Sequence, residues 1–283
     1  MEKMANRVVI RKASGEAELY DESKLKQSLR SAGAEEKLVE DVADDVREWL
    51  YDGVSTRKMY ARAFSLLRRK NRLTALRYRL KKSIFELGPT GYPFERLVGE
   101  IIKKQGYETE VGQIIAGHCV EHEMDVIATK KEEQVLAECK FAMDQGKSVS
   151  VQVPLYVRSR VDDIVKKRMK EPVYKDFKFY GWIVTNVRFS PDSMVYGKCS
   201  GLKLISWDYP RGAGLKELIE SLKVFPVTLL NQLKKQEKAF LLENGIVACT
   251  QLAENREIMI SMGYNDKTQK DLLKDIDELC SLF

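Results

Sequence analysis

The sequence predicts an α/β protein built from three consecutive parts. Residues 6–88 read as a β-hairpin followed by helices, and residues 213–283 carry only helical patterns. Between them, residues 92–212 give the order α-β-β-β-α-β-α-β, which is typical of a mixed sheet with helices on its faces. The stretch "GPTGYP" at residues 88–93, with two glycines and two prolines, marks the boundary after the first part.

Composition places the chain among soluble globular proteins. Of 283 residues, 44% are hydrophobic and 32% charged, and no apolar run is long enough to span a bilayer. The start "MEKMANRVVIRK" has no signal-peptide core, so we expect a cytoplasmic protein without a membrane partner. Five scattered cysteines without a CxxC pair argue against a disulfide framework and a zinc ribbon. The net charge of +6 mildly favours a polyanionic partner.

The first part begins with the hairpin "RVVIRKASGEAELYD", whose turn we expect at Ser14-Gly15. Helices then follow from "DESKL" to Gly33 and from "EKLVE" to Gly53, and one or two more follow "STRKMY". The run from Arg57 to Lys82 holds eleven lysines and arginines and no acid. Such a run is either a solvated helix face or a surface that meets phosphates.

This part resembles the ATP-cone, a nucleotide-binding regulatory module. The resemblance rests on the basic pair Arg11-Lys12, on "YDESKL" with Lys24, and on "YDGVSTRKMY" with Thr56 and Tyr60. It implies that Arg11, Lys12 and Lys24 meet the phosphates of ATP or dATP, and that Thr56 and Tyr60 line the nucleotide pocket. Cationic side chains suit triphosphate oxygens, because charge-assisted hydrogen bonds are strong. The sequence contains no P-loop, so we expect an effector that is bound without being hydrolysed.

The second part contains an ionisable pattern that packing alone would not require. The apolar runs "DVIAT" and "VLAECK" are separated by "KKEEQ" and read as a hairpin. Alternate strand residues share a face, so Glu138 and Lys140 point the same way, and Asp125 on the paired strand can reach the same edge. Two converging carboxylates repel unless a cation lies between them.

Hard oxygen ligands suit Mg²⁺ or Mn²⁺, so we expect a divalent cation between Asp125 and Glu138. The backbone carbonyl of Cys139, and Glu95 from the preceding helix, are further candidate ligands. Lys140 beside the metal would orient an attacking water or stabilise charge on a phosphate. The alternative is a half-exposed hairpin with an ordinary ion pair between Glu138 and Lys140.

The surrounding pattern resembles the PD-(D/E)xK nuclease superfamily, and within it the Mrr-type restriction endonucleases. The leading helix "FERLVGEIIKKQGY" places Glu95 at the matching acidic position, and the Asp125 strand and the "ECK" strand follow in the expected order. "QVPLY" matches the QxxxY signature of related nucleases through Gln152 and Tyr156. The resemblance implies phosphodiester hydrolysis of DNA, with Gln152 helping to orient the water. His118 and His122 are interpreted as loop histidines near the DNA path in preference to metal ligands.

The third part carries the run "LLENGIVACTQLAE", which looks like a helix-hairpin-helix element centred on Gly245. Such a turn presents backbone N–H groups to DNA phosphates. The alternative is a helical cap that completes the hydrophobic core.

Two function classes follow from these patterns. The first is a Mg²⁺-dependent DNA endonuclease regulated by ATP or dATP. The second is a non-catalytic, nucleotide-responsive DNA-binding regulator. The sequence does not determine whether the protein forms a homo-oligomer or which DNA it cleaves. It also does not determine whether the nucleotide activates or inhibits cleavage.

Overall fold

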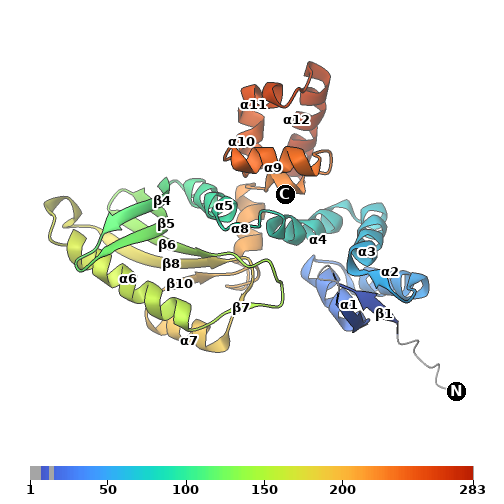
Figure 1. Ribbon diagram of the computed structural model, residues 1–283, viewed down its shortest axis with the longest axis horizontal. Helices are drawn as coiled ribbons and strands as arrows, with labels where there is room; N and C mark the ends of the chain where they lie inside the picture. Colours follow the sequence, from blue (N-terminus) through green and yellow to red (C-terminus); the bar gives the residue numbers. More distant parts are fainter. Residues whose placement is uncertain (1–7, 13–15, 283) are drawn as a thin grey trace. The chain divides into compact units, whose positions relative to one another are not determined.

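The computed structural model describes residues 8–12 and 16–282 and divides the chain into two compact units, residues 1–82 and 83–283. Mixed sheets, flanking helices and a helical C-terminal segment confirm the predicted α/β class (Figure 1). The turn expected at Ser14-Gly15 lies outside the described residues. The three-part division at residues 88–92 and 212–213 stays a prediction. None of the described helices is long and apolar enough to cross a bilayer.

The first unit combines a small sheet with helices. Strand β1 pairs antiparallel with β2 and parallel with β3, which gives the order β2-β1-β3. The elements are β1 (Val9–Arg11), β2 (Ala17–Leu19), α1 (Glu22–Ser31), α2 (Glu36–Trp49), β3 (Val54–Ser55), α3 (Thr56–Lys70) and α4 (Arg72–Phe85), of which α4 continues past residue 82 into the second unit.

The helices of this unit begin and end where the sequence signals lie. The side chains of Asp21 and Ser55 accept N–H groups at the starts of α1 and α3, as N-cap residues do. Their apolar faces meet in one buried cluster that includes Leu25, Leu29, Val39, Val42, Val46, Ala63 and Leu67. The helices therefore owe most of their stability to this shared core.

The second unit is built on a five-stranded sheet of order β10-β8-β6-β5-β4. Strands β4, β5 and β6 are antiparallel, whereas β6, β8 and β10 are parallel, as the predicted mixed sheet requires. Strands β7 and β9 form a separate parallel pair. The elements are α5 (Tyr92–Lys103), β4 (Glu108–Ala116), β5 (Glu121–Lys130), β6 (Glu133–Lys140), β7 (Ser148–Val149), α6 (Gln152–Arg168), η1 (Pro172–Tyr174), β8 (Lys178–Thr185), β9 (Arg188–Phe189), α7 (Pro191–Cys199) and β10 (Lys203–Ile205).

The central hairpin is longer than the apolar runs predicted. Strands β5 and β6 pair out to Lys130 and Glu133, so the charged "KKEEQ" is mostly strand, and the turn is Lys131-Glu132. The difference arises because ladder bonds at an exposed hairpin end need no apolar side chains.

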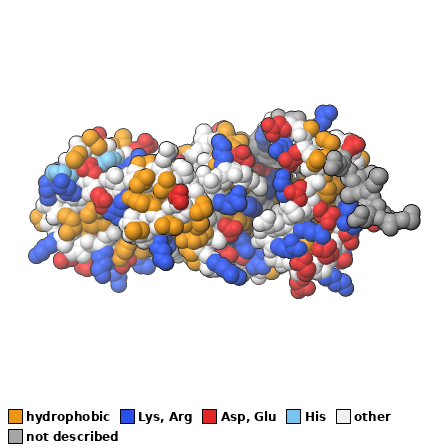
Figure 2. Space-filling model, turned by 90° about the horizontal axis from the view of Figure 1, so that it is seen from below, with side chains coloured by type: hydrophobic (Ala, Val, Ile, Leu, Met, Phe, Trp, Pro, Cys, Tyr) orange, Lys and Arg blue, Asp and Glu red, His pale blue; other side chains and the backbone are white. Residues whose placement is uncertain are grey.

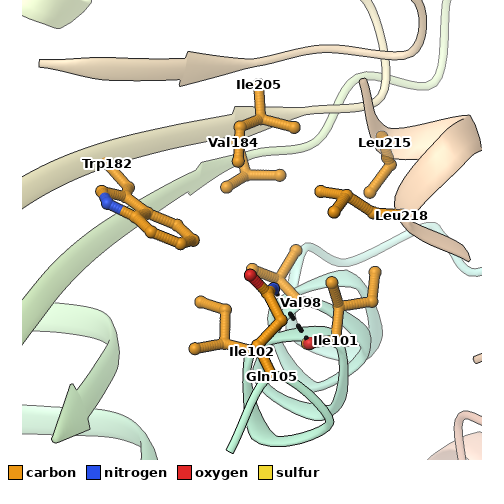
Figure 3. A pocket seen from close by; sticks show the side chains of 9 residues that line it. All are labelled: Val98, Ile101, Ile102, Gln105, Trp182, Val184, Ile205, Leu215 and Leu218. Atoms are coloured by element: carbon orange, nitrogen blue, oxygen red, sulfur yellow. Dashed lines mark hydrogen bonds between the residues drawn. The ribbon is translucent and has the colours of Figure 1, made fainter. Parts of the chain in front are cut away.

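Helices cover both faces of this sheet. Helix α6 packs on one face through Val157, Val161 and Ile164, against Leu136 and Ile183 of the strands. On the other face, side chains of α5, β8, β10 and α8 (Leu215–Leu222) meet around a gap of about 10 Å³ (Figure 3). The gap is apolar and no larger than one water, so this region is core and not a ligand pocket.

The C-terminal segment consists of four short helices that follow α8 and of a longer last helix. They are η2 (Val227–Leu229), α9 (Lys235–Glu243), α10 (Cys249–Glu254), α11 (Arg256–Ser261) and α12 (Asp266–Ser281). The residues around the turn between α9 and α10 are deeply buried, among them Leu241, Val247, Ala248, Cys249 and Leu252.

The N–H groups of that turn are already bonded inside the protein. Gly245 and Ile246 donate to Leu242 and Leu241, and the N–H groups of Val247 and Ala248 both donate to the Gln251 side chain. Donors in use cannot also face phosphates, so this geometry favours the helical cap over the helix-hairpin-helix interpretation.

Candidate active site

Asp125 lies where the hydrogen-bonding ladders on both sides of β5 are interrupted. The β5–β6 ladder ends at the pair Val126 and Ala137, and its register continued by one residue places Asp125 opposite Glu138. There the Asp125 side chain accepts the Cys139 N–H, with 2.6 Å between Oδ2 and N. On the other side, the β4–β5 register skips Gly112 and Asp125, and a Cβ on Gly112 would meet nothing within 4 Å. The strand pair is therefore locally open at Gly112, which lies opposite Asp125 in the register.

Glu138 is the centre of a cluster of cationic and hydroxyl groups. Its side chain is 4% exposed, and its Oε1 lies 2.6 Å from Lys140 Nζ and accepts the Tyr156 hydroxyl at 2.8 Å. Its Oε2 lies 2.6 Å from Nη1 of Arg160, which also donates to the carbonyl of Glu123 at 3.0 Å. A carboxylate this deeply buried is stable only when it is paired and hydrogen-bonded.

Two other carboxyl groups of the site are less fully compensated. Burial, followed by the charge of Glu138, raises the pKa of Asp125 to about 6, against the opposing effect of the Cys139 N–H. Burial, followed by the charges of Asp125 and Glu123, raises the pKa of Glu95 to about 7. These groups carry partial negative charge at neutral pH and would each gain from a nearby cation.

Lys140 is a firmly held cation. Burial lowers its pKa, but the hydrogen bond and the charge of Glu138 outweigh burial, and the net pKa lies above the ordinary value. A lysine that holds its proton this strongly can stabilise negative charge and orient a water, but it cannot take a proton from that water at neutral pH.

The types of residue at the site suit a divalent cation, but both carboxylate oxygens of Glu138 already have partners in the protein. Carboxylate oxygens are what Mg²⁺ prefers, and the raised pKa values of Asp125 and Glu95 indicate charge that a cation would compensate. Within residues 8–12 and 16–282, however, no three His, Cys, Asp or Glu groups are close enough to hold a metal ion as they stand. A cation at Asp125 and Glu138 therefore requires Glu138 to exchange one of its present partners.

Helix α6 brings one expected residue, Tyr156, and one unexpected residue, Arg160, to Glu138. Gln152 is the first residue of the helix and is exposed, whereas Tyr156, one turn later, reaches Glu138. Pro154 lies in the first turn, where a proline is tolerated. Arg160 is not among the residues expected from the sequence, although its position four residues after Tyr156 puts it on the same helix face.

His118 lies in the loop between β4 and β5, as expected, whereas His122 lies within strand β5, so the loop interpretation is wrong for His122. His122 Nε2 is 2.8 Å from Asp163 Oδ2, and His118 Nδ1 is 3.2 Å from Lys170 Nζ. Both partners belong to the C-terminal end of α6 and the residues just after it.

The expected nucleotide residues lie in the first unit, and only some of them come together. Arg11 pairs with Ser55 across β1 and β3 and is therefore next to Thr56. Lys12 and Lys24 both lie near Glu18, with Nζ–Oε2 distances of 3.0 and 3.6 Å. A hydrogen bond to Glu18 is the main cause of the raised pKa of Lys12.

Tyr60 is part of the helical core of this unit. Its ring stacks on Tyr78 at a centroid distance of 4.6 Å, and its hydroxyl donates to the Tyr78 carbonyl at 2.9 Å. The ammonium of Lys82 lies over the ring, 4.7 Å from the centroid. A role in packing accounts for these contacts without a nucleotide.

Comparison with known proteins relates the chain to one group. Residues 225–280 match the family model described as AF1548-like, C-terminal. The sequence is 28% identical to an uncharacterized protein of Archaeoglobus fulgidus over 179 residues, which is 63% of this chain and 97% of that protein.

Solved structures give two likenesses. The crystal structure of AF1548, a protein of unknown function, superposes with a TM-score of 0.54 at 27% identity, over 68% of this chain and 99% of its own. MspJI restriction endonuclease in complex with a 27-mer oligonucleotide covers 59% of this chain and 40% of its own, at 15% identity and a TM-score of 0.29, which is too small a likeness to support an argument. The chain is thus similar to the AF1548-like proteins, whose descriptions state no activity.

Proposed function

We propose that this chain is a metal-dependent DNA endonuclease whose activity responds to ATP or dATP bound by its first unit. The observation that carries the proposal is the convergence of Asp125, Glu138 and Lys140 on the neighbouring strands β5 and β6. The likeness of the sequence pattern to PD-(D/E)xK nucleases supports DNA as the substrate.

A bound Mg²⁺ or Mn²⁺ would polarise the scissile phosphate and the attacking water. Asp125, Glu138, the Cys139 carbonyl and Glu95 are the groups that would hold it. Lys140 keeps its proton and stabilises negative charge that develops on the phosphate. Gln152, exposed at the start of α6, would help to orient the water.

Arg160 and Tyr156 act as positioning residues in this proposal. Each holds one oxygen of Glu138 from α6, so they set the direction in which the carboxylate faces. Arg160 additionally ties α6 to the backbone of β5 at Glu123. Positioning groups of this kind contribute by keeping a reacting group in productive geometry.

The test is cleavage of plasmid DNA by the full chain with Mg²⁺ or Mn²⁺, with and without ATP or dATP. We expect nicking by the wild type and none by Asp125→Ala, while Asp275→Ala, an exposed acid on α12, cuts like the wild type. Cleavage by the Asp125→Ala variant at the wild-type rate would remove the proposal.

One observation favours a second candidate, a non-catalytic nucleotide-responsive DNA-binding regulator. Both oxygens of Glu138 are satisfied by Lys140, Tyr156 and Arg160, and such a closed cluster can also serve only to hold α6 on the sheet. A wild type that binds DNA but never cuts it, with either metal and either nucleotide, would select this candidate.

A further inference from the structure

Helix α6 continues past the Glu138 cluster into a basic end. Asp163, Lys166, Lys167 and Lys170 are spaced i, i+3, i+4 and i+7, so they lie on one side of the helix and of the turn that follows it. The three lysines are exposed. These lysines are not part of the candidate active site, and the hydrophobic core does not need charged side chains at these positions.

The loop between β4 and β5 is tied to this end of the helix. The His118 N–H donates to the Asp163 carbonyl at 2.9 Å, and the Asp163 carboxylate accepts the N–H groups of Cys119 at 2.9 Å and Val120 at 3.4 Å. Together with His122, these donors occupy the carboxylate of Asp163, the one acid among the four residues of this helix side. The lysine ammonium groups are therefore left facing solvent, with His118 beside Lys170.

The electrostatics agree with this placement. The charges of Lys166 and then Lys170 are the main reason that the pKa of His118 lies below its ordinary value. Figure 2 shows Lys and Arg side chains gathered beside one of the two pale-blue histidine side chains.

The basic end lies on the same side of α6 as the candidate site. Tyr156, Arg160, Asp163, Lys167 and Lys170 follow one another at intervals of three or four residues. At 1.5 Å per residue, Lys170 lies about 15 Å along the helix axis from Arg160. Phosphates of one DNA strand are spaced about 3.4 Å along the duplex axis, so this length corresponds to about four base pairs.

We propose that Lys166, Lys167, Lys170 and His118 form a phosphate-contacting stripe along which the backbone of a DNA strand lies as it approaches Glu138. The assignment of DNA as the polyanion rests on the proposed function, because the stripe is continuous with the residues proposed to act on a phosphodiester. Lysine ammonium groups are point charges that bind phosphates without reading base sequence. The stripe therefore contributes affinity and orientation, not sequence specificity.

The test uses the full chain and a fluorescent DNA duplex in EDTA, where binding is measured without cleavage. Lys166→Gln/Lys167→Gln/Lys170→Gln removes three exposed charges from the stripe, and Lys267→Gln/Lys270→Gln/Lys274→Gln removes three exposed charges from α12 as the matched control. We expect the stripe variant to bind at least about tenfold more weakly near 100 mM salt, and the slope of log K against log salt to shrink by about 2 to 3. The control is expected to stay within about twofold of the wild type, since its lysines contact no phosphate.

Equal affinity and equal salt slope for the stripe variant and the wild type would overturn the stripe. Phosphatidylserine vesicles provide a second arm: stripe-dependent binding to vesicles with unchanged binding to DNA would also overturn it, in favour of a lipid surface. Cleavage is scored separately with Mg²⁺. If the stripe variant loses DNA affinity and salt dependence, the inference about the stripe is supported, even if the wild type never cuts DNA. If the wild type cuts DNA and the stripe variant binds DNA normally, the proposed function stands and the inference about the stripe is wrong.

Discussion

Asp125 and Glu95 are two carboxyl groups that the fold holds close to their own titration range. Their pKa values, raised to about 6 and about 7, arise first from burial and then from neighbouring carboxylates. The folded protein thus keeps these protons to a higher pH than the unfolded chain does. The resulting cost is absent below about pH 4 and grows as the pH rises toward 7.

Replacing Asp125 by Asn should remove its part of that cost while keeping an oxygen for the Cys139 N–H. We expect Asp125→Asn to be more stable than the wild type by about 2 kcal/mol at pH 7.5 and nearly equal at pH 4. Urea unfolding at both pH values, in EDTA, measures the difference. Parallel pH dependences of the two proteins would contradict the raised pKa.

Arg160 neutralises a buried carboxylate, and Arg158, two residues earlier, does not. Arg160→Met leaves Glu138 with Lys140 as its remaining charged partner, so we expect a loss of about 3 kcal/mol in unfolding free energy. Arg158→Met breaks an ion pair with the exposed Asp162 and should cost less than about 1 kcal/mol. Equal losses of unfolding free energy in the two variants, measured by denaturant unfolding, would show that the contact of Arg160 with Glu138 contributes no more than an exposed ion pair.

At the scale of elements, the turn between α9 and α10 depends on a glycine for two separate reasons. Gly245 has a φ of +77°, and a Cβ there would clash with Nη1 of Arg96 on α5. Gly263, after α11, has the same φ of +77° and nothing within 4 Å. The turn therefore packs against α5, as a cap on the second unit would.

Comparing alanine substitutions at Gly245 and Gly263 distinguishes the cost of backbone strain from the cost of side-chain packing. Gly263→Ala should cost about 1 kcal/mol, the strain of a left-handed alanine, while Gly245→Ala should cost somewhat more, because the terminal guanidinium of the flexible Arg96 side chain must also move. Thermal unfolding of both variants provides the measurement. A Gly245→Ala variant no less stable than Gly263→Ala would mean that the turn is free of α5.

At the scale of the whole molecule, nucleotide control of the chain requires that the first unit bind ATP or dATP. Lys12 and Lys24 now lie beside Glu18, which competes with phosphates for the same ammonium groups. Glu18→Gln should therefore tighten ATP binding roughly two- to fivefold, since it removes an exposed competing charge. Calorimetric titration with ATP measures the change, and a weaker affinity of the Glu18→Gln variant would contradict this role of Glu18.

Lys12→Ala/Lys24→Ala should weaken ATP binding and abolish any effect of ATP on plasmid cleavage, while nucleotide-free cleavage stays unchanged. Thermal stabilisation by ATP and the cleavage rate, both measured on the full chain, check this. An ATP effect on cleavage that survives in the double variant would place the nucleotide elsewhere.

The sequence alone determined the α/β class and the neighbouring carboxylates, because both follow from local periodicity. Apolar alternation reports that a strand is buried, and residues two apart in a strand share a face, so Glu138 and Lys140 had to point together. Helix starts are equally local, because cap residues such as Asp21 and Ser55 bond to N–H groups only two or three residues further along the chain.

Only the tertiary structure decided which distant groups meet. Arg160 and Tyr156 reach Glu138 because α6 lies across β6, and no local pattern records which strand a helix will cover. The same holds for Lys12 and Lys24 beside Glu18, and for the N–H groups of the Gly245 turn, which are bonded within the protein. Burial and charge in three dimensions set the pKa values of Asp125, Glu95 and Lys140, since each depends on neighbours from other elements.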